Sequence, residues 1–234
     1  MSEMYTKHAS EYSEAVKTNI CNSCFERPST ISLLDDVKDK NVIDMGCGPG
    51  VYAEWFIQRS VNQLTCIDAS YEMIELVKNK FPDSVKAYVQ DLSLGLPQEK
   101  SNSADVIVCP LVIHYIKDLS LIFADVFRIL KVGGYLVFST HHPFADFECS
   151  NTGNYFEREL VKEEWDTIGK PVEVSFYRRS LTEVCNAITS SGLVITKISE
   201  GVVNERAKNI SENTYNHLKN KPNFIFFRCE KIHT

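Results

Sequence analysis

The chain has no long hydrophobic run. None of its apolar stretches approaches the roughly 18 residues that a membrane-spanning helix needs, so we expect no membrane partner. The N-terminal segment, residues 1–10, is polar and lacks the apolar centre of a secretory signal peptide. No internal repeat and no low-complexity tract is present. These absences predict a soluble protein in the cytoplasm.

Excess positive charge is also missing. The 25 Lys and Arg residues are outnumbered by 31 Asp and Glu residues, which gives a formal net charge of −6. A nucleic-acid-binding surface normally needs a basic patch, so we expect no nucleic-acid partner. The 234 residues, 44% of them hydrophobic, are enough for one large α/β domain with a sizeable core.

A cysteine framework is absent, although the chain has eight cysteines. Without a secretory signal a reducing compartment is expected, where cysteines remain free thiols. Cys21 and Cys24 form a C-x-x-C pair, but no second pair with zinc-like spacing follows. We therefore predict no metal site. Four further cysteines fall at core-like positions in or beside predicted strands or turns, namely Cys47, Cys66, Cys109 and Cys229.

A glycine-rich turn is the most informative feature that the sequence does have. An apolar run over residues 42–45 predicts a buried strand, and Gly46, Gly48 and Gly50 follow it. A helix is predicted from Tyr52 to about Arg59. Glycines can adopt positive φ in a tight turn and let a ligand lie against the bare backbone. Strand, glycine turn and helix together indicate a nucleotide-binding α/β unit.

Acidic residues near strand ends narrow the choice of nucleotide. Asp44 precedes the glycines, and Asp68 and Asp91 end the next two apolar runs. A carboxylate at such a strand end can accept both hydroxyls of a ribose. The dinucleotide motif requires a third glycine where this chain has Val51, and no Gly-Lys-Ser/Thr phosphate loop is present. The pattern therefore disfavours a dinucleotide or a nucleoside triphosphate.

These segments resemble the class I S-adenosylmethionine-dependent methyltransferases. Residues 44–50, Asp-Met-Gly-Cys-Gly-Pro-Gly, match the first motif of that family, and Asp68 stands where its ribose-binding acid stands. Gln-Asp-Leu at 90–92 matches its adenine-side motif. Residues 128–135 match the turn before the fifth strand, with Val132 in place of the usual proline. The resemblance covers about residues 28–142 and implies the cofactor S-adenosyl-L-methionine.

The resemblance also implies roles for single residues. The three glycines would lie against the methionine part of the cofactor, and Asp44 would orient their turn. Asp68 would accept from the ribose hydroxyls and Asp91 from the adenine amino group, while Met73 is either an adenine contact or core. The cofactor-binding set that we expect is Asp44, Gly46, Cys47, Gly48, Gly50, Asp68, Ala69, Met73, Gln90, Asp91, Leu92 and Pro110.

Strand and helix patterns alternate along the chain, which predicts a doubly wound, mostly parallel sheet with helices on both faces. The resemblance implies seven strands in a Rossmann-like methyltransferase fold, with the last strand antiparallel. Helices are predicted over 28–37, 52–59, 71–80, 118–131 and 181–191, and strands over 42–45, 64–68, 85–90, 104–109, 135–139, 193–199 and 224–230.

Three further segments are predicted outside this alternation. Residues 28–234 would form the methyltransferase domain, and residues 1–27 precede it. This N-terminal segment would be a helical lid or an ordinary packing helix, with Tyr5, His8 and Tyr12 on one face. Residues 143–178 are rich in aromatic residues and would cap the substrate site after the fifth strand or simply cover the sheet. Residues 200–223 are polar and predicted to be a linker.

Catalytic and substrate-binding residues are predicted at the strand ends and in the cap. Methyl transfer needs the two reacting atoms held in line and sometimes a base, and neutral histidine is a ready base near pH 7. The candidates for the base are His142 and His114, with His141 beside them; adjacent strand residues point to opposite faces, so His141 and His142 should not share a metal. The substrate-binding candidates are Tyr5, Tyr12, Tyr155, Trp165 and Arg178.

The sequence thus predicts a methyltransferase that acts on a small-molecule acceptor, as a monomer or homodimer. N-methylation of a planar heterocycle suits the aromatic cap. O-methylation of a carboxylate, including that of a peptide or carrier-bound acid, suits Arg178, although Arg178 could equally be a solvated side chain. Two alternatives of other classes remain: an NAD-dependent oxidoreductase and a non-catalytic S-adenosylmethionine-binding protein.

Overall fold

A seven-stranded sheet forms the centre of the computed structural model, which describes residues 2–232. The strand order is β3-β2-β1-β4-β5-β9-β8, and only β9 runs antiparallel to its neighbours β5 and β8. This confirms the predicted fold class. The strands are β1 (Asn41–Met45), β2 (Gln63–Asp68), β3 (Lys86–Val89), β4 (Ala104–Pro110), β5 (Leu130–His141), β8 (Val194–Ser199) and β9 (Phe224–Glu230).

Helices cover both faces of this sheet. Successive side chains of β1 point to opposite faces, so Val42 enters the core under α3 and α4 while Ile43 enters the core under α5 and α7. Ser70 caps α4 as predicted, because its Oγ accepts the Met73 N–H at 3.1 Å. The four helices are α3 (Val51–Ile57), α4 (Tyr71–Lys80), α5 (Ser120–Ile129) and α7 (Leu181–Ser190).

The N-terminal segment is helical, but its helices differ from the predicted bounds. A 3-10 turn η1 (Glu3–Tyr5) and helix α1 (Ala9–Thr18) lead into a π-helix η2 (Cys21–Glu26) and the short α2 (Arg27–Ile31). The observed helix α2 therefore begins and ends earlier than the helix predicted over 28–37. Pro28 has no N–H for an α-helical bond to the carbonyl of Cys24, and that carbonyl instead accepts the Asn204 N–H at 2.7 Å.

The stretch after β5 forms a separate hairpin rather than more of the sheet. Helix α6 (Pro143–Asp146) and the turn η5 (Phe147–Cys149) lead to strands β6 (Glu159–Trp165) and β7 (Val172–Arg178), which pair antiparallel. Val172 and Val174 of β7 pack with Met4. The hairpin and the N-terminal segment therefore contact each other.

Residues 200–223 are not the plain linker that their polarity suggested. They contain α8 (Arg206–Ile210) and α9 (Glu212–Asn220), and Ser211 caps α9 through the Thr214 N–H at 3.2 Å. Tyr215 and Leu218 lie on one face of α9 and are buried. Because only these two apolar residues define the face, the polar composition concealed it.

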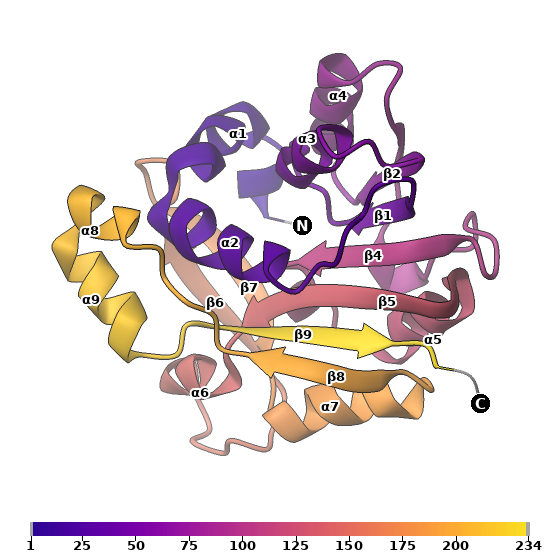
Figure 1. The fold of residues 1–234 in the computed structure, drawn as a ribbon. Coiled ribbons are helices and arrows are strands. Elements are labelled where there is room, and N and C mark those ends of the chain that lie inside the picture. The colour runs from indigo at the N-terminus through magenta and orange to yellow at the C-terminus, as the bar shows by residue number, and fades with distance from the viewer. Residues whose placement is uncertain (1, 233–234) are drawn as a thin grey trace.

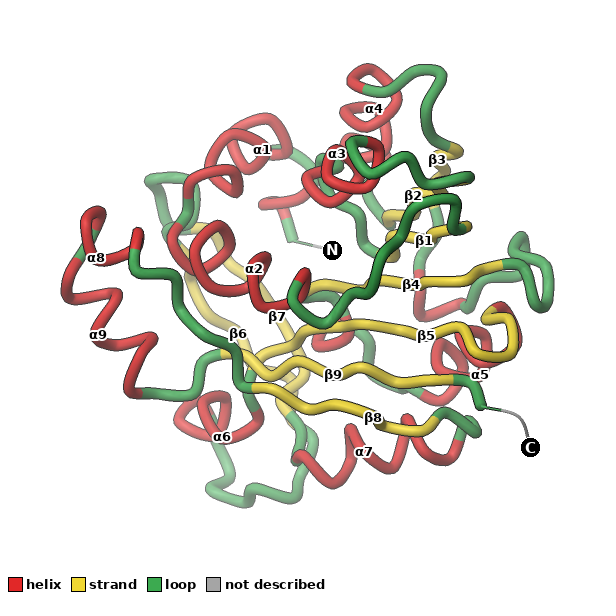
Figure 2. Tube along the Cα trace, viewed as in Figure 1, coloured by secondary structure: helices red, strands yellow, loops and turns green. Residues whose placement is uncertain are grey.

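All of these additions gather at one edge of the sheet. In Figure 1 the parallel strands β4 and β5 run toward the left, and α1, α2, α6, α8, α9 and the β6–β7 hairpin lie on that side. Figure 2 shows the same grouping along the trace, with loops joining these segments to the strand ends. Among the helices of residues 2–232, none is both long and apolar enough to cross a bilayer.

Candidate active site

The glycine turn after β1 has the left-handed backbone that the sequence predicted. Gly46, Gly48 and Gly50 have φ values of +70°, +52° and +79°. A Cβ on Gly46 would lie 2.1 Å from Cγ2 of Val112, so this position has no room for a side chain. A Cβ on Gly48 would meet nothing within 4 Å. The turn is therefore tightly packed on the Gly46 side and open at Gly48.

Two strand-end acids lie beside this turn. Asp68, at the end of β2, accepts the Gly48 N–H at 2.9 Å and the Ser70 N–H at 2.8 Å. These bonds hold its carboxylate against the turn, although burial raises its pKa. Asp91, after β3, accepts the Ser93 N–H at 2.8 Å and is exposed.

Asp44 differs from the other two acids because it is fully buried within β1. Neither carboxylate oxygen has a hydrogen-bond partner among residues 2–232. Burial first, and then the charges of Asp68 and Glu26, raise the pKa of Asp44 to about 8. The structure shows no bond from Asp44 to the glycine turn that the resemblance expected it to orient.

One cavity of about 1500 Å³ lies over the carboxyl ends of the strands. Typical sites for a single small ligand occupy about 300–1000 Å³, so this cavity has room for two. Nine of the predicted cofactor-binding residues line it: Gly46, Cys47, Gly48, Asp68, Ala69, Met73, Asp91, Leu92 and Pro110. Asp44, Gly50 and Gln90 do not line it.

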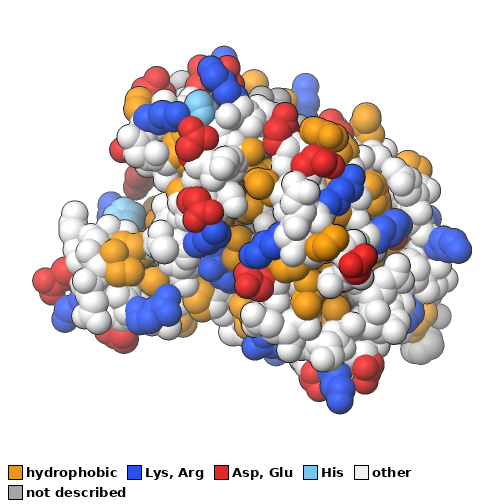
Figure 3. Space-filling view, turned by 90° about the horizontal axis from the view of Figure 1, so that it is seen from above, with side chains coloured by type: hydrophobic (Ala, Val, Ile, Leu, Met, Phe, Trp, Pro, Cys, Tyr) orange, Lys and Arg blue, Asp and Glu red, His pale blue; other side chains and the backbone are white. Residues whose placement is uncertain are grey.

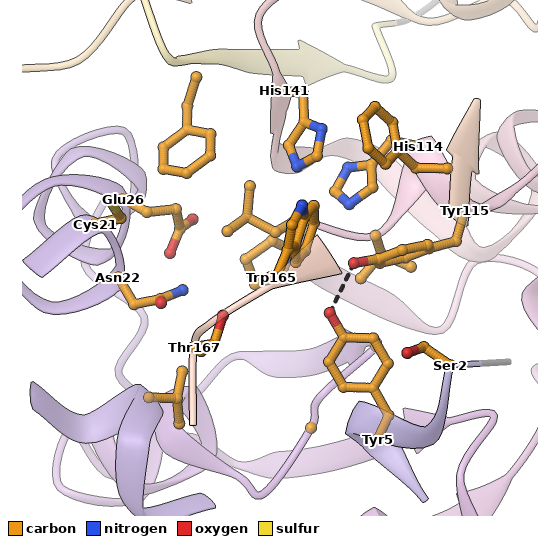
Figure 4. A pocket seen from close by; sticks show the side chains of 18 of the residues that line it. Ser2, Tyr5, Cys21, Asn22, Glu26, His114, Tyr115, His141, Trp165 and Thr167 are labelled. Atoms are coloured by element: carbon orange, nitrogen blue, oxygen red, sulfur yellow. Dashed lines mark hydrogen bonds between the residues drawn. The ribbon is translucent and has the colours of Figure 1, made fainter. Parts of the chain in front are cut away.

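Two of the three candidate histidines stack at the other end of the cavity. The rings of His114 and His141 are 3.9 Å apart and nearly parallel, and both line the cavity (Figure 4). His114 Nδ1 lies 3.2 Å from the Thr140 hydroxyl. Burial, and then the neighbouring His141 and Arg179, hold the pKa of His114 well below the usual range. His141 Nδ1 lies 3.3 Å from Oδ1 of Asp146, which leaves Nε2 free to accept a proton.

His142 lies elsewhere and does not line the cavity. Its Nδ1 accepts the Phe144 N–H at 3.2 Å and caps α6, and its Nε2 lies 3.1 Å from Glu200. His141 and His142 thus have separate partners, as the strand geometry predicted. The geometry supports His142 as a structural residue and gives no support to it as the base.

Two predicted substrate-binding residues also lie outside the cavity wall. Arg178 is buried, pairs with Glu159 through Nε and donates to the carbonyl of Asn154 at 2.5 Å. The Tyr155 hydroxyl accepts the Leu181 N–H at 3.0 Å. Arg178 thus connects β7 to a loop of the cap, and Tyr155 connects the cap to the start of α7. Arg178 is therefore neither the acid-binding residue nor the solvated side chain considered from the sequence.

The other three substrate candidates do line the cavity. Figure 4 shows Trp165 in its centre and the Tyr5 hydroxyl bonded to that of Tyr115, 2.7 Å away. The Tyr5 and Tyr12 rings meet edge to face at 5.1 Å. The Tyr5 carbonyl also accepts from the Ser70 hydroxyl at 2.6 Å, which ties the N-terminal segment to the cofactor side.

Sequence reasoning missed Glu26, a buried acid on the same cavity wall. Its carboxylate accepts hydrogen bonds from the hydroxyls of Thr30, Tyr52 and Ser139 at 2.7–2.9 Å. Burial raises its pKa and these bonds oppose that rise. Thr30 is four residues away, but Tyr52 and Ser139 come from distant segments, so the sequence around Glu26 does not mark it as a site residue.

Arg27 follows Glu26 and also lines the cavity. Its Nη2 donates to the carbonyl of Val16 at 3.0 Å, and its buried Nε has no partner among residues 2–232. No group of three or more His, Cys, Asp or Glu side chains is arranged to hold a metal ion in that part of the chain.

The face seen in Figure 3 carries acidic and basic side chains interspersed, with no broad basic patch. Such a surface has no strong single-sign field to attract a polyanion. That the protein has no nucleic-acid partner stays a prediction.

Comparisons with known proteins agree with this geometry. The family model described as a methyltransferase domain matches residues 43–138. An uncharacterised protein of Haemophilus influenzae is 22% identical over 90% of this chain and 89% of its own length. The malonyl-[acyl-carrier protein] O-methyltransferase of Legionella pneumophila is 25% identical, over 61% of this chain and only 50% of its own length.

Among solved structures, an S-adenosylmethionine-dependent methyltransferase from Mesorhizobium loti aligns with a TM-score of 0.74. It is 22% identical, and the alignment covers 92% of this chain and 99% of that one. At 22% identity, this similarity shows a shared fold and no more.

Proposed function

We propose that this chain is a class I S-adenosylmethionine-dependent methyltransferase, and that it methylates nitrogen or oxygen of a small molecule held under the β6–β7 hairpin. The observation that carries this proposal is one continuous cavity. It joins the glycine turn and Asp68 to the stacked histidines and Trp165. Cofactor and acceptor can therefore lie in contact and away from bulk water, which positions the reacting atoms.

The residues present fit the cofactor. The left-handed turn is open at Gly48, so a ligand can approach its backbone there. In this proposal Asp68 accepts from the ribose hydroxyls and Asp91 from the adenine amino group. Arg27 lines the same cavity, and its guanidinium, with an unpartnered Nε, suits the carboxylate of the methionine part. When bound, S-adenosylmethionine supplies a methyl group on a sulfonium, and the carbon–sulfur electron pair stays on sulfur as the acceptor lone pair bonds to carbon.

The chain's own part in the transfer is to orient the acceptor and to take its proton. We assign the proton to Nε2 of His141, because the Asp146 carboxylate beside Nδ1 stabilises the imidazolium that forms. His114, kept neutral by burial, presents a hydrogen-bonding Nε2 to the acceptor. Tyr5, Tyr12 and the cap exclude water from this end.

The N-terminal segment acts as a lid in this proposal, and residues 143–178 act as the cap. Tyr5 bonds to Tyr115 on the sheet side, and Ser2 Oγ donates to the carbonyl of Glu173 on the hairpin at 2.7 Å. Breaking such contacts would widen the entrance to the cavity. Methylation of a carboxylate loses its sequence support, because Arg178 is paired with Glu159 away from the cavity.

Calorimetric titration with S-adenosylhomocysteine, with NAD run alongside, tests the cofactor site. We expect micromolar binding of the first and none of the second. Asp68→Ala should weaken S-adenosylhomocysteine binding by roughly tenfold to a hundredfold, because ribose hydroxyls lose a charged acceptor. Asp83→Ala, on an exposed turn outside the cavity, is the matched control. Binding of NAD alone, or equal affinities for the two variants, contradicts the proposal.

A further inference from the structure

The acceptor end of the cavity carries carboxylates that no cation neutralises. Glu163 on β6 and Asp146 on α6 both line it. Glu163 accepts from the Cys149 thiol at 2.8 Å and from Trp165 Nε1 at 3.0 Å, and both donors are neutral. Asp146 faces His141. Within residues 2–232, neither carboxylate has a Lys or Arg nitrogen within 4 Å, so negative charge accumulates here.

The acids at this end of the cavity all affect the thiol of Cys149. Burial, the bond to Glu163 and the charges of Glu163, Asp146 and Glu148 together raise the pKa of Cys149 to about 12. The Cys149 thiol is therefore within the negative field of all three carboxylates. A cation at this position would relieve that repulsion.

A packed cluster of aromatic rings lies beside these acids. The ring of His141 lies 5.6 Å from Trp165 and 4.8 Å from Phe176, and Trp165 and Phe176 are 5.9 Å apart. The negative faces of aromatic rings attract cations, and tryptophan does so most strongly. Its Nε1–H donates to Glu163, which places a carboxylate at the edge of the ring.

Cationic side chains are directed away from this end. Arg178 pairs with Glu159, and Arg179 donates to the carbonyl of Ile116 at 2.5 Å; neither lines the large cavity. Arg27, Lys170 and Lys221 line the cavity; Lys170 is exposed and pairs with Glu11 at 3.2 Å, and Lys221 is exposed just after α9. None of these cations lies within 4 Å of Glu163 or Asp146, so an anionic group beside those two acids would meet like charge.

A buried polar atom at this end also lacks a partner. His114 is 3% exposed and lines the cavity, and its Nε2 has no hydrogen-bond partner among residues 2–232. Since buried polar atoms are nearly always paired, this nitrogen indicates a ligand with a polar group beside the histidine stack.

Resting on the methyltransferase function proposed above, we infer that the acceptor is an amine that is protonated in solution and carries an apolar or planar group. Its ammonium is drawn between Glu163, Asp146 and the ring of Trp165. One N–H proton passes to Nε2 of His141, and the freed nitrogen lone pair forms the N–CH₃ bond. The C–S bond breaks with its electrons on sulfur, and the product is a methylammonium ion.

The test measures binding rather than turnover. Trp55 and Trp165 are the two tryptophans of the chain, so a Trp55→Phe protein reports the acceptor end through Trp165 fluorescence. Phenethylammonium, 2-phenylethanol and 3-phenylpropanoate serve as cationic, neutral and anionic probes of similar shape, each titrated with S-adenosylhomocysteine saturating. We expect the ammonium to bind roughly tenfold or more tightly than the other two.

A matched pair of variants locates the source of this preference. Glu163→Gln keeps an oxygen for Trp165 Nε1 but removes the charge, and it should abolish the preference for the ammonium. Glu164→Gln makes the same change on the exposed face of β6 and should keep it.

Three results overturn the inference: equal or tighter binding of the alcohol or carboxylate, no binding of the ammonium at millimolar concentration, or a preference that survives Glu163→Gln. Titration of the same sample with S-adenosylhomocysteine separates the two proposals. If that ligand binds, the loss concerns the amine alone; if it does not, the methyltransferase proposal and the amine inference fail together.

Discussion

At the scale of single residues, partners distinguish the histidines that carry chemistry from the one that carries structure. His141 opens onto the cavity and has a carboxylate behind it, whereas both ring nitrogens of His142 are bonded within the fold. From the sequence alone, His142 is preferred as the base and His141 is only placed beside it. The alternation of side chains at the end of β5 makes the difference.

His141→Ala should therefore lower turnover by about 10²–10⁴-fold, which is the usual contribution of a general base. Affinity for S-adenosylhomocysteine should change little, because the histidine lies at the acceptor end. Steady-state kinetics and calorimetry measure the two effects. His142→Asn keeps a capping acceptor for α6 and should retain most turnover. Similar losses of turnover in both variants would show that His141 is not the base.

Asp44 is a buried residue whose ionisation destabilises the folded state. Its pKa rises from an unfolded value near 4 to about 8 in the folded protein. Between these values the folded state holds a proton that the unfolded state has released, so the free energy of unfolding falls as pH rises. The slope can reach about 1.4 kcal/mol per pH unit, and it ends above the folded pKa.

Replacing Asp44 with Asn should flatten this dependence. The variant has no proton to release, so its advantage over the parent should grow from about pH 5 to about pH 8. Urea unfolding of the ligand-free protein at several pH values measures it. Parallel curves for parent and variant would mean that Asp44 ionises in the folded state at an ordinary pKa.

At the scale of elements, the turn between β1 and α3 combines a packing requirement with a binding one. A side chain on Gly46 would collide with Val112, whereas one on Gly48 would project into open space. Both positions have positive φ, which costs an alanine about 1–2 kcal/mol. Only Gly46 adds a steric penalty.

Gly46→Ala should consequently reduce the free energy of unfolding by about 2–4 kcal/mol, the strain and the overpacking together. Gly48→Ala should cost only about 1–2 kcal/mol, yet weaken S-adenosylhomocysteine binding because the methyl group stands where the ligand approaches. Urea titration and calorimetry on both variants separate stability from binding. Equal destabilisation would show that Val112 moves aside readily.

The N-terminal segment is the element whose function most depends on motion. It contacts the cofactor side through Ser70, the sheet through Tyr115 and the cap through Glu173. If it is a lid, its opening must be rarer when the cavity is filled. Amide exchange in α1 should then slow on binding of S-adenosylhomocysteine, while exchange in α7, on the far core, stays unchanged. No added protection in α1 would leave the segment as a packing helix.

At the scale of the whole molecule, one edge of the sheet collects nearly everything of functional interest. The carboxyl ends of parallel strands meet there, and the strand order reverses between β1 and β4. The lid, the cap and α9 then enclose that edge from different parts of the chain (Figure 1). The acceptor end therefore combines histidines that follow β4 and end β5 with segments outside the parallel sheet.

The sequence by itself determined the parallel sheet, the glycine turn and the strand-end acids. Those features depend on local periodicity and on backbone conformations that only certain residues adopt, so neighbouring residues are enough to reveal them. The predicted bounds of a helix were wrong where the structure has a distant contact, as at Pro28, where the carbonyl of Cys24 accepts the Asn204 N–H.

Only the tertiary structure decided what each charged or polar side chain faces. It placed Arg178 against Glu159, surrounded Glu26 with three hydroxyls and left Glu163 among aromatic rings without a cation. In the sequence these residues are equivalent charges on polar or half-polar segments. Thr30 and Trp165 are near neighbours in the sequence, but the other partners lie farther along the chain. The energy of a charge depends on its neighbours in space, which no local pattern encodes.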